Sequence, residues 1–220
     1  SLFMNPKIYT GNGSTNNITG VGFQPDWVWT KCRSTVNSSR LIDAVRGVTK
    51  AIVSNSSGAE FTEANGLSAF GTDGYTLNGN LASMNTNSDT YVSWNWKANG
   101  AGSANTSGCS ISQYTGNATD NASVGHGLGT APKMLIIKEI TSTSNWGVWH
   151  QDLTDGGYRL SLQETTAQVS DTAFMGGGNR AIPTNSVFYL GSGGGGNSSS
   201  DNYIAYAFSE IKGFSKMGSY

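Results

Sequence analysis

The sequence contains few charged residues. Only 12% of its 220 residues are Asp, Glu, Lys or Arg, well below the roughly 25% that is usual in soluble globular proteins. The formal net charge at pH 7 is −1, and no run of basic residues occurs. Since nucleic-acid binding depends on clustered Lys and Arg, the composition does not support a nucleic-acid partner.

Cysteine and long apolar runs are also scarce. The two cysteines are Cys32, on an expected strand, and Cys109, in an expected linker. They do not recur in each half of the chain, so two free thiols are favoured over a disulfide. No stretch approaches about 20 apolar residues, which argues against membrane insertion. There is no secretory signal, and because the chain begins with Ser1 we expect a fragment or a processed form.

Glycine and aromatic residues are abundant. The chain has 30 Gly, 6 Trp, 9 Tyr and 8 Phe, and this aromatic content argues against disorder. Asn-Gly pairs favour two-residue hairpin turns, because both residues tolerate positive φ. These pairs occur at residues 12–13, 65–66, 78–79 and 99–100. The sequence therefore predicts a β-rich protein with many turns.

One tetrapeptide, Tyr-Thr-Gly-Asn, occurs twice, at residues 9–12 and 105 positions later at 114–117. Two further pairs of segments match in residue character and follow in the same order. These pairs are 25–31 with 132–138, and 91–96 with 203–208. A repeat of this length is close to the size of a small domain, so the chain is interpreted as a tandem duplication.

Short alternating segments separated by turn signals, without a sustained helical period, predict an all-β fold of two tandem antiparallel β-sandwiches. The expected boundaries are a first repeat over 1–98, a Gly/Ser/Asn linker over 99–109, a second repeat over 110–213, and the start of a further repeat or an exchanged strand over 214–220. Strands are expected near 5–9, 26–33, 40–45, 50–54, 74–78, 90–97, 110–115, 133–140, 145–150, 157–163, 186–190 and 202–211, with 60–62 and 67–70 as strands or one brief helix.

Alternating aromatic residues lie on the last predicted strand of each repeat. Val92, Trp94 and Trp96 share one face, and residues 204, 206 and 208 of the second repeat share the matching face. Because these residues change identity between the repeats and stay apolar, we interpret them as core, in preference to a sugar-stacking platform. Trp27 and Trp29 are interpreted in the same way.

Trp146 and Trp149 differ, because they fall on opposite faces of one short strand. Both cannot lie in one core, so we expect one of them to be exposed. An exposed indole beside His150 could stack on a pyranose ring. The predicted ligand-binding residues, for a glycan, are therefore Trp146, Trp149 and His150.

No catalytic constellation is evident. His126 lies in a glycine-rich turn without Cys, Asp or Glu at metal-ligand spacing. Glycoside hydrolysis needs two carboxylates facing one cleft, and no such pair can be nominated. Asp152 and Asp155 are interpreted as solvated loop carboxylates in preference to calcium ligands. There is no Gly-x-Ser-x-Gly elbow, so we expect no enzyme, metal or cofactor.

Several motifs together are similar to those of a known family. They occupy residues 94–103, 114–117, 124–134, 203–210 and 213–220. In this order they resemble the tandem repeat of tail- and fibre-associated proteins of tailed bacteriophages, especially marine ones, over nearly all of 7–220. The resemblance implies a virion structural protein on an extracellular surface appendage, with lectin-like sandwiches of jelly-roll or concanavalin type. It provides no catalytic residue.

The expected function is therefore a non-enzymatic repeat module of a tail fibre or similar appendage, acting as a spacer, a host adhesin or both. Its expected partners are other copies of itself, other virion proteins and host surface polysaccharide. Two alternatives remain open. One is a filament subunit joined by exchange of the segment 214–220. The other is a polysaccharide depolymerase, with carboxylates about 5–9 Å apart.

Overall fold

A computed structural model describes residues 3–98 and 106–219, and within them every regular element is a β-strand. The expected all-β class is confirmed. In chain order the strands are β1 (Met4–Thr10), β2 (Asn16–Ile18), β3 (Trp27–Cys32), β4 (Arg40–Asp43), β5 (Lys50–Ala51), β6 (Phe61–Thr62), β7 (Leu67–Gly71), β8 (Gly74–Leu77), β9 (Thr90–Trp96), β10 (Cys109–Thr115), β11 (Ser123–Gly125), β12 (Met134–Glu139), β13 (Gly147–His150), β14 (Tyr158–Ser161), β15 (Val169–Ser170), β16 (Val187–Tyr189) and β17 (Asn202–Phe208). Strands β2, β11 and β15 were not anticipated. Within the described residues no helix is long and apolar enough to span a membrane.

The chain divides into two compact units. Unit 1 comprises Ser1–Asn55 and Glu60–Ala98, and unit 2 comprises Ser56–Ala59 and Asn99–Tyr220. Most of the expected linker, residues 99–105, lies outside the described residues. Residues 56–59 belong to unit 2, although the chain on both sides of them belongs to unit 1.

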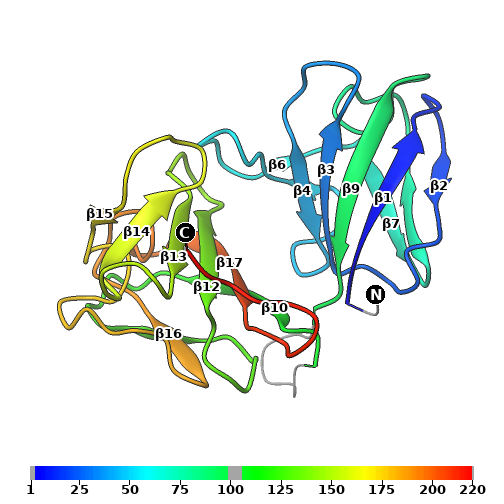
Figure 1. Ribbon diagram of the computed structural model, residues 1–220. Helices are drawn as coiled ribbons and strands as arrows, with labels where there is room; N and C mark the ends of the chain where they lie inside the picture. Colours follow the sequence, from blue (N-terminus) through cyan, green and yellow to red (C-terminus); the bar gives the residue numbers. More distant parts are fainter. Residues whose placement is uncertain (1–2, 99–105, 220) are drawn as a thin grey trace. The chain divides into compact units, whose positions relative to one another are not determined.

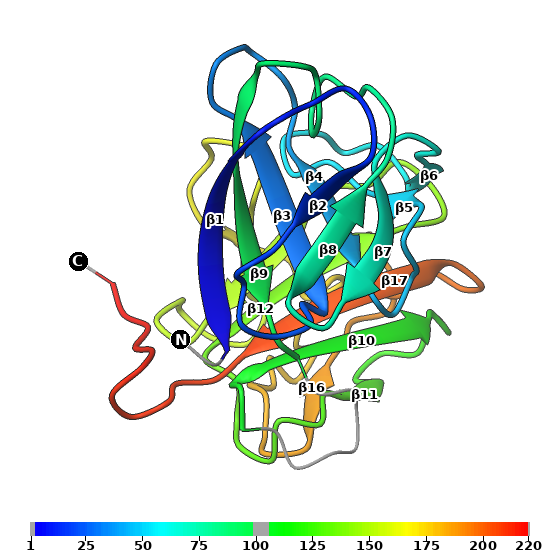
Figure 2. The same ribbon diagram turned by 90° about the vertical axis from the view of Figure 1, so that its right-hand side faces the viewer.

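Unit 1 contains a four-stranded sheet in the order β1-β9-β3-β4 and a three-stranded sheet in the order β2-β8-β7, all antiparallel (Figure 1). A short β5-β6 pair completes it. The two larger sheets form two layers (Figure 2). Both layers contribute to one core, which consists of Ile18, Val28, Ile42, Ala51, Leu67, Tyr75, Leu77 and Met84.

Unit 2 contains a six-stranded sheet in the order β10-β17-β12-β13-β14-β15 and a β11-β16 pair. Its first four strands repeat the order of the four-stranded sheet of unit 1. The core consists of Leu128, Leu135, Ile137, Trp149, Phe174, Met175, Phe188, Leu190, Tyr203, Ala205 and Ala207.

The repeated tetrapeptide has the same structural environment in both units. Its tyrosine stacks on a tyrosine of the neighbouring strand, Tyr9 on Tyr91 at 5.3 Å and Tyr114 on Tyr203 at 5.0 Å between ring centroids. Its glycine has no room for a side chain: a Cβ at Gly11 would lie 2.2 Å from a backbone oxygen. The tetrapeptide therefore has a structural role, because its tyrosine and glycine pack against neighbouring segments of the same unit.

A buried carboxamide holds each tetrapeptide in place. The Asn85 Nδ2 group donates to the carbonyls of Ser14 and Gly79 at 2.6 and 2.9 Å, and Oδ1 accepts from the Asn12 amide at 3.1 Å. In unit 2, Asn197 makes the equivalent bonds. Its partners are Gly191 O at 2.6 Å, Thr119 O at 3.0 Å and Asn117 N at 2.9 Å.

The aromatic stripe of the first repeat does not lie where the sequence analysis placed it. The core-facing residues of β9 are Tyr91, Ser93 and Asn95, whereas Trp94 and Trp96 are half-buried on the opposite face. The predicted core role is therefore wrong for these two residues, for Val92 on the same face of β9, and for Trp29. Alternation identifies two faces of a strand, but it does not say which face the second layer covers.

The expected terminal strand is also absent from residues 214–219. The chain turns at Gly213, whose φ is 80°, and the backbone makes an isolated bridge between Ile211 and Ser215. The Met217 amide then donates to the Glu210 carboxylate at 2.9 Å. These local contacts form a turn in place of the strand.

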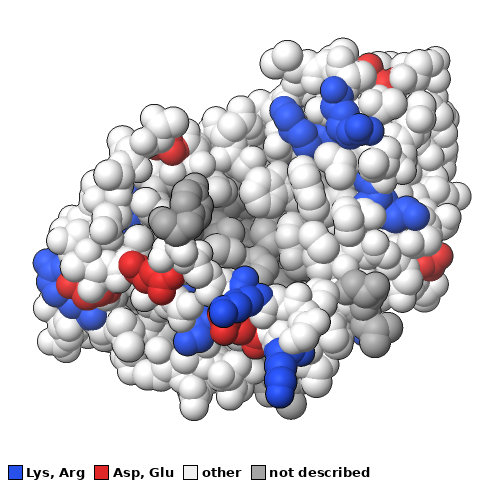
Figure 3. All heavy atoms as spheres, viewed as in Figure 1, with Lys and Arg blue, Asp and Glu red and all other residues white. Residues whose placement is uncertain are grey.

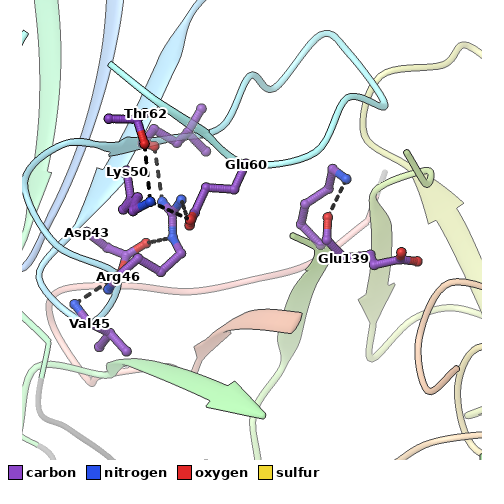
Figure 4. A network of polar contacts seen from close by, with 9 residues as sticks. Asp43, Val45, Arg46, Lys50, Glu60, Thr62 and Glu139 are labelled. Carbon is purple, nitrogen blue, oxygen red and sulfur yellow. Dashed lines mark hydrogen bonds and ion pairs between the residues drawn. The ribbon is translucent and has the colours of Figure 1, made fainter. Parts of the chain in front are cut away.

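A buried ion pair stabilises the chain after β4. Arg46 lies between two carboxylates, with Nε 2.6 Å from Asp43 Oδ2 and Nη1 3.1 Å from Glu60 Oε2 (Figure 4). The Arg46 and Asp43 side chains are 1% and 0% exposed. Arg46 Nη2 also donates to the Leu41 carbonyl at 3.1 Å. The Lys50 side chain, 3.9 Å from Glu60, is 42% exposed.

We expect Asn85→Ala to lower the free energy of unfolding of unit 1 by about 2–3 kcal/mol, because it leaves buried backbone groups without their partner. Urea denaturation of the whole chain, followed by fluorescence, measures the change. The exposed Asn87 provides the control, and Asn87→Ala should change stability by less than about 0.5 kcal/mol. Equal effects of the two variants would contradict the structural role of the carboxamide.

We expect Arg46→Met to destabilise unit 1 by about 3–5 kcal/mol, because Asp43 then stays buried without its nearest cation. Asp43→Asn in the same background should restore part of the loss. Lys50→Met removes an exposed partner of Glu60 and should cost less than about 1 kcal/mol. Guanidinium denaturation compares the variants, and an Arg46→Met effect as small as that of Lys50→Met would contradict this expectation.

Candidate functional site

The tryptophans predicted to bind a glycan are both buried in unit 2. Trp146 is 0% exposed and Trp149 is 4% exposed. Trp149 lies in the core, with Nε1 donating to the Asp155 carbonyl at 3.3 Å, and Trp146 Nε1 donates to the Ser56 carbonyl at 3.0 Å. The expectation that one of them is exposed is wrong, because the segment 56–59 also forms part of unit 2.

The third predicted residue, His150, is close to the surface. Its side chain is 18% exposed, and Nδ1 accepts from the Asp152 amide at 3.2 Å. The structure thus places Trp146, Trp149 and His150 on and beside one strand without an open indole face. A glycan site at these residues lacks the stacking surface on which the prediction rested.

Of the two carboxylates considered as calcium ligands, Asp152 is 36% exposed, and the partly exposed Asp155 is paired with an arginine. Arg180 Nη1 donates to both carboxylate oxygens of Asp155, to Oδ1 at 3.1 Å and to Oδ2 at 3.0 Å. Asp171 is paired with Arg159 at 2.8 Å. Across residues 3–98 and 106–219, no group of three or more His, Cys, Asp or Glu side chains is arranged to hold a metal ion. Cys32 and Cys109 are buried free thiols, as expected.

An open aromatic surface lies instead on unit 1. We define the outer face as the face of the four-stranded sheet opposite the core. Cross-strand register places its residues in three rows, which are Met4 with Trp96 and Trp27, Pro6 with Trp94 and Trp29, and Ile8 with Val92 and Lys31. Adjacent strands lie about 4.8 Å apart, so the side chains within one row are in reach of one another.

Four of these side chains, Met4, Trp29, Trp94 and Trp96, line a cavity of about 360 Å³. We call this cavity the tryptophan pocket. Its walls are almost wholly apolar, and it is open to solvent. The volume falls within the roughly 300–1,000 Å³ that is typical of small-molecule sites.

The rings of the pocket are held by other rings. Trp96 stacks on the buried Trp27, with 4.4 Å between centroids and 28° between planes. Trp29 meets Trp94 edge to face, at 6.2 Å and 70°. Aromatic pairs in these geometries are each worth about 0.5–1.5 kcal/mol beyond their buried area. The pocket is therefore preorganised by its own packing.

Charged groups are sparse around the pocket, as they are over the visible face of the molecule (Figure 3). None of the four lining side chains is titratable. The outer face carries Lys31 in the next row, and Asp43, which is paired with Trp27 in register, is committed to Arg46. The pocket can bind an apolar or amphipathic surface, but its lining provides no general acid, base or nucleophile.

The signal for this site was present in the sequence but was assigned to the wrong side of the sheet. Trp94 and Trp96 alternate with Ser93 and Asn95, and the small polar residues are the ones that face the second layer. The Asn95 Nδ2 group is paired there, because it donates to the Asn5 carbonyl at 2.8 Å, whereas the buried Oδ1 atom accepts no hydrogen bond. Polar residues with backbone partners can thus occupy an interior that indoles would overfill.

His126 has a structural role. The ring is fully buried, Nδ1 accepts from the Leu128 amide at 3.2 Å, and Nε2 donates to the Thr184 carbonyl at 3.0 Å. Burial lowers the pKa of His126 below its ordinary value, and the hydrogen bond to Thr184 offsets this in part. The ring is therefore held neutral.

Comparison with known proteins identifies one family. The family described as "Domain of unknown function (DUF7483)" matches residues 1–220. The chain belongs to the DUF7483 family. No curated protein and no solved structure matches it. The functional argument for this DUF7483 member therefore rests on its own residues.

We expect unit 2 to lose stability as the pH falls from 7 to 5. The folded-state pKa of His126 is lowered below the unfolded value of about 6.5. The stabilising contribution is then fully present above about pH 6.5 and is lost as the pH falls through the folded-state pKa. Urea denaturation at several pH values should show a weaker dependence in His126→Gln. His150→Gln is the matched control, and an unchanged profile in His126→Gln would contradict the assignment.

Proposed function

We propose that this chain is a non-enzymatic module of a surface appendage of a tailed bacteriophage, and that its tryptophan pocket binds a pyranose ring of a host-surface polysaccharide. The observation that carries the binding proposal is an open, preorganised pocket lined by three indoles that do not belong to the core. The appendage is inferred from the sequence resemblance described above.

A sugar ring suits this pocket because it is amphipathic. Its C–H face is apolar and can lie against an indole, while its hydroxyl groups stay at the rim in water. The indole N–H groups are donors without acceptor capacity and can pair with those hydroxyls. The cavity of about 360 Å³ is large enough for a small ligand and open enough for a chain to continue on both sides.

Binding without catalysis is favoured by the pocket lining. Hydrolysis of a glycosidic bond uses a pair of carboxyl groups about 5–9 Å apart, and Met4, Trp29, Trp94 and Trp96 include none. The filament alternative has less support, since the described residues 214–219 contain no strand and Ser215 forms an isolated bridge with Ile211 of the same chain. We therefore favour the adhesive module over both alternatives.

The architecture that we propose for each unit is a β-sandwich. In unit 1 this is supported by a core that draws on both larger sheets, with Val28 and Ile42 from one and Leu67 and Leu77 from the other. Such modules repeat readily along an appendage, next to copies of themselves or other virion proteins. Several weak sugar sites on one appendage would act together through their high effective concentration.

We expect the whole chain to bind at least one bacterial surface polysaccharide saturably, and Trp94→Ala to weaken that binding at least tenfold, about 1.4 kcal/mol. Removal of the indole removes one wall of the pocket. Titration calorimetry against a panel of such polysaccharides measures the affinity. Phe61→Ala is the matched control, because Phe61 is an exposed aromatic residue of unit 1 outside the pocket. Equal affinities of Trp94→Ala and the unmodified chain, or no binding to any polysaccharide, would overturn the proposal.

A further inference from the structure

We propose that the ligand of the tryptophan pocket is an anionic pyranose, whose carboxylate or sulfate group is bound by Lys31. This inference rests on the proposed function and specifies its ligand. It follows from the position of Lys31, from its lack of an ion pair, and from a comparison with Lys138, the buried lysine at the matching position of unit 2.

Lys31 lies on the outer face in the row next to the pocket. It follows Trp29 by two positions on β3, so both side chains project from the same face of the strand. Two residues of a strand span about 6.6 Å, a separation that a substituent of a ring stacked on Trp29 can cover. Lys31 is paired in register with Val92, and Ile8 completes the row with 65% exposure. Lys31 is thus the charged member of an otherwise apolar row.

The charge of Lys31 is not neutralised within the part of the chain that the structure describes. Its ammonium group donates to the Asn37 carbonyl and takes part in none of the seven ion pairs found there. An ammonium has three donors, so two remain for a ligand. The carboxylate of Asp43 on the same face is fully buried against Arg46. The pocket therefore has a cation at one end and no competing anion in its three rows.

An anion suits this arrangement better than a neutral hydroxyl group does. Hydrogen bonds between an ammonium and a carboxylate or sulfate are roughly twice as strong as those between neutral groups. Lys31 is half-buried beside apolar side chains, so water screens the contact less than at a fully exposed lysine. The indoles would hold the ring, and the lysine would fix the end at which its acidic group lies.

Unit 2 provides an internal comparison. The aligned segments 25–31 and 132–138 place Lys138 at the position of Lys31. Lys138 is fully buried, and its ammonium donates to the Glu139 carbonyl at 2.5 Å. Burial lowers the pKa of Lys138 to about 8. Two of the four pocket residues, Trp29 and Trp94, correspond to Ile136 and Tyr206, which are buried. Both units thus have a lysine at this position, but only in unit 1 does it lie next to the tryptophan pocket, while Lys138 of unit 2 is buried.

The test uses the whole chain and three probes: a polyuronate oligosaccharide, its carboxyl-reduced neutral counterpart, and a sulfated polysaccharide. We expect at least one of the anionic probes to bind at least tenfold more tightly than the neutral one, with the difference shrinking as salt is raised. Lys31→Met should abolish the difference in affinity between the anionic probes and the neutral one. Lys31→Arg should retain the preference. The probe that binds more tightly identifies the acidic group.

Lys7→Met is the matched control, because Lys7 lies on β1 of the same sheet but faces the opposite side of that sheet. A chain that binds the three probes equally, or a Lys31→Met variant that keeps the anionic preference, would overturn this inference. The proposed function would stand in that case if Trp94→Ala still weakened binding of every probe. Absence of binding to all carbohydrates would instead overturn the proposed function itself.

Discussion

The buried carboxamides of Asn85 and Asn197 are the constraint on which both units depend. Each joins backbone groups from separate loops to the asparagine that ends a Tyr-Thr-Gly-Asn turn. Buried polar groups must be paired, so these bonds determine where the first strand of each unit ends. The stacked tyrosines and the closely packed glycines follow from that placement. In unit 1 the strand so positioned is β1, which brings Met4 to the pocket.

The four-strand order that the two units share carries different side chains in each unit. In unit 2 the core face of β17 carries Tyr203, Ala205 and Ala207, and its other face is also buried. In unit 1 the core face of β9 carries Ser93 and Asn95, and large indoles occupy the other face. Indoles left partly in water do not contribute their full hydrophobic stabilisation. Their presence on an open face therefore supports a role in binding.

Local patterns predicted much of the fold. Alternation located the longer strands, and the repeated tetrapeptide indicated a shared strand order, which the first four strands of the two largest sheets have. The expected two-residue Asn-Gly hairpins are wrong for residues 12–13, 65–66 and 78–79, because the strands that these loops connect do not pair with each other, and residues 99–100 lie outside the described residues. Two features were beyond such patterns. The side of the β9 strand that faces the second layer depends on partners remote in sequence, so the pocket at Trp94 was assigned to the core. The burial of Trp146 depends on residue 56, which lies 90 positions earlier, and no local signal marks that contact.

The segment Ser56–Ala59 has a consequence for how the two units could be separated. Unit 2 uses the carbonyls of Ser56 and Ser57, to which Trp146 Nε1 and the Ser144 amide donate at 3.0 and 2.9 Å. A fragment that starts at residue 99 would lack both acceptors, although the sequence repeat suggests a clean boundary there. The two units therefore cannot be separated by a single cut at residue 99 without loss of contacts. An exchange of unit 1 for another sequence would have to keep a segment equivalent to Ser56–Ala59 that fits unit 2.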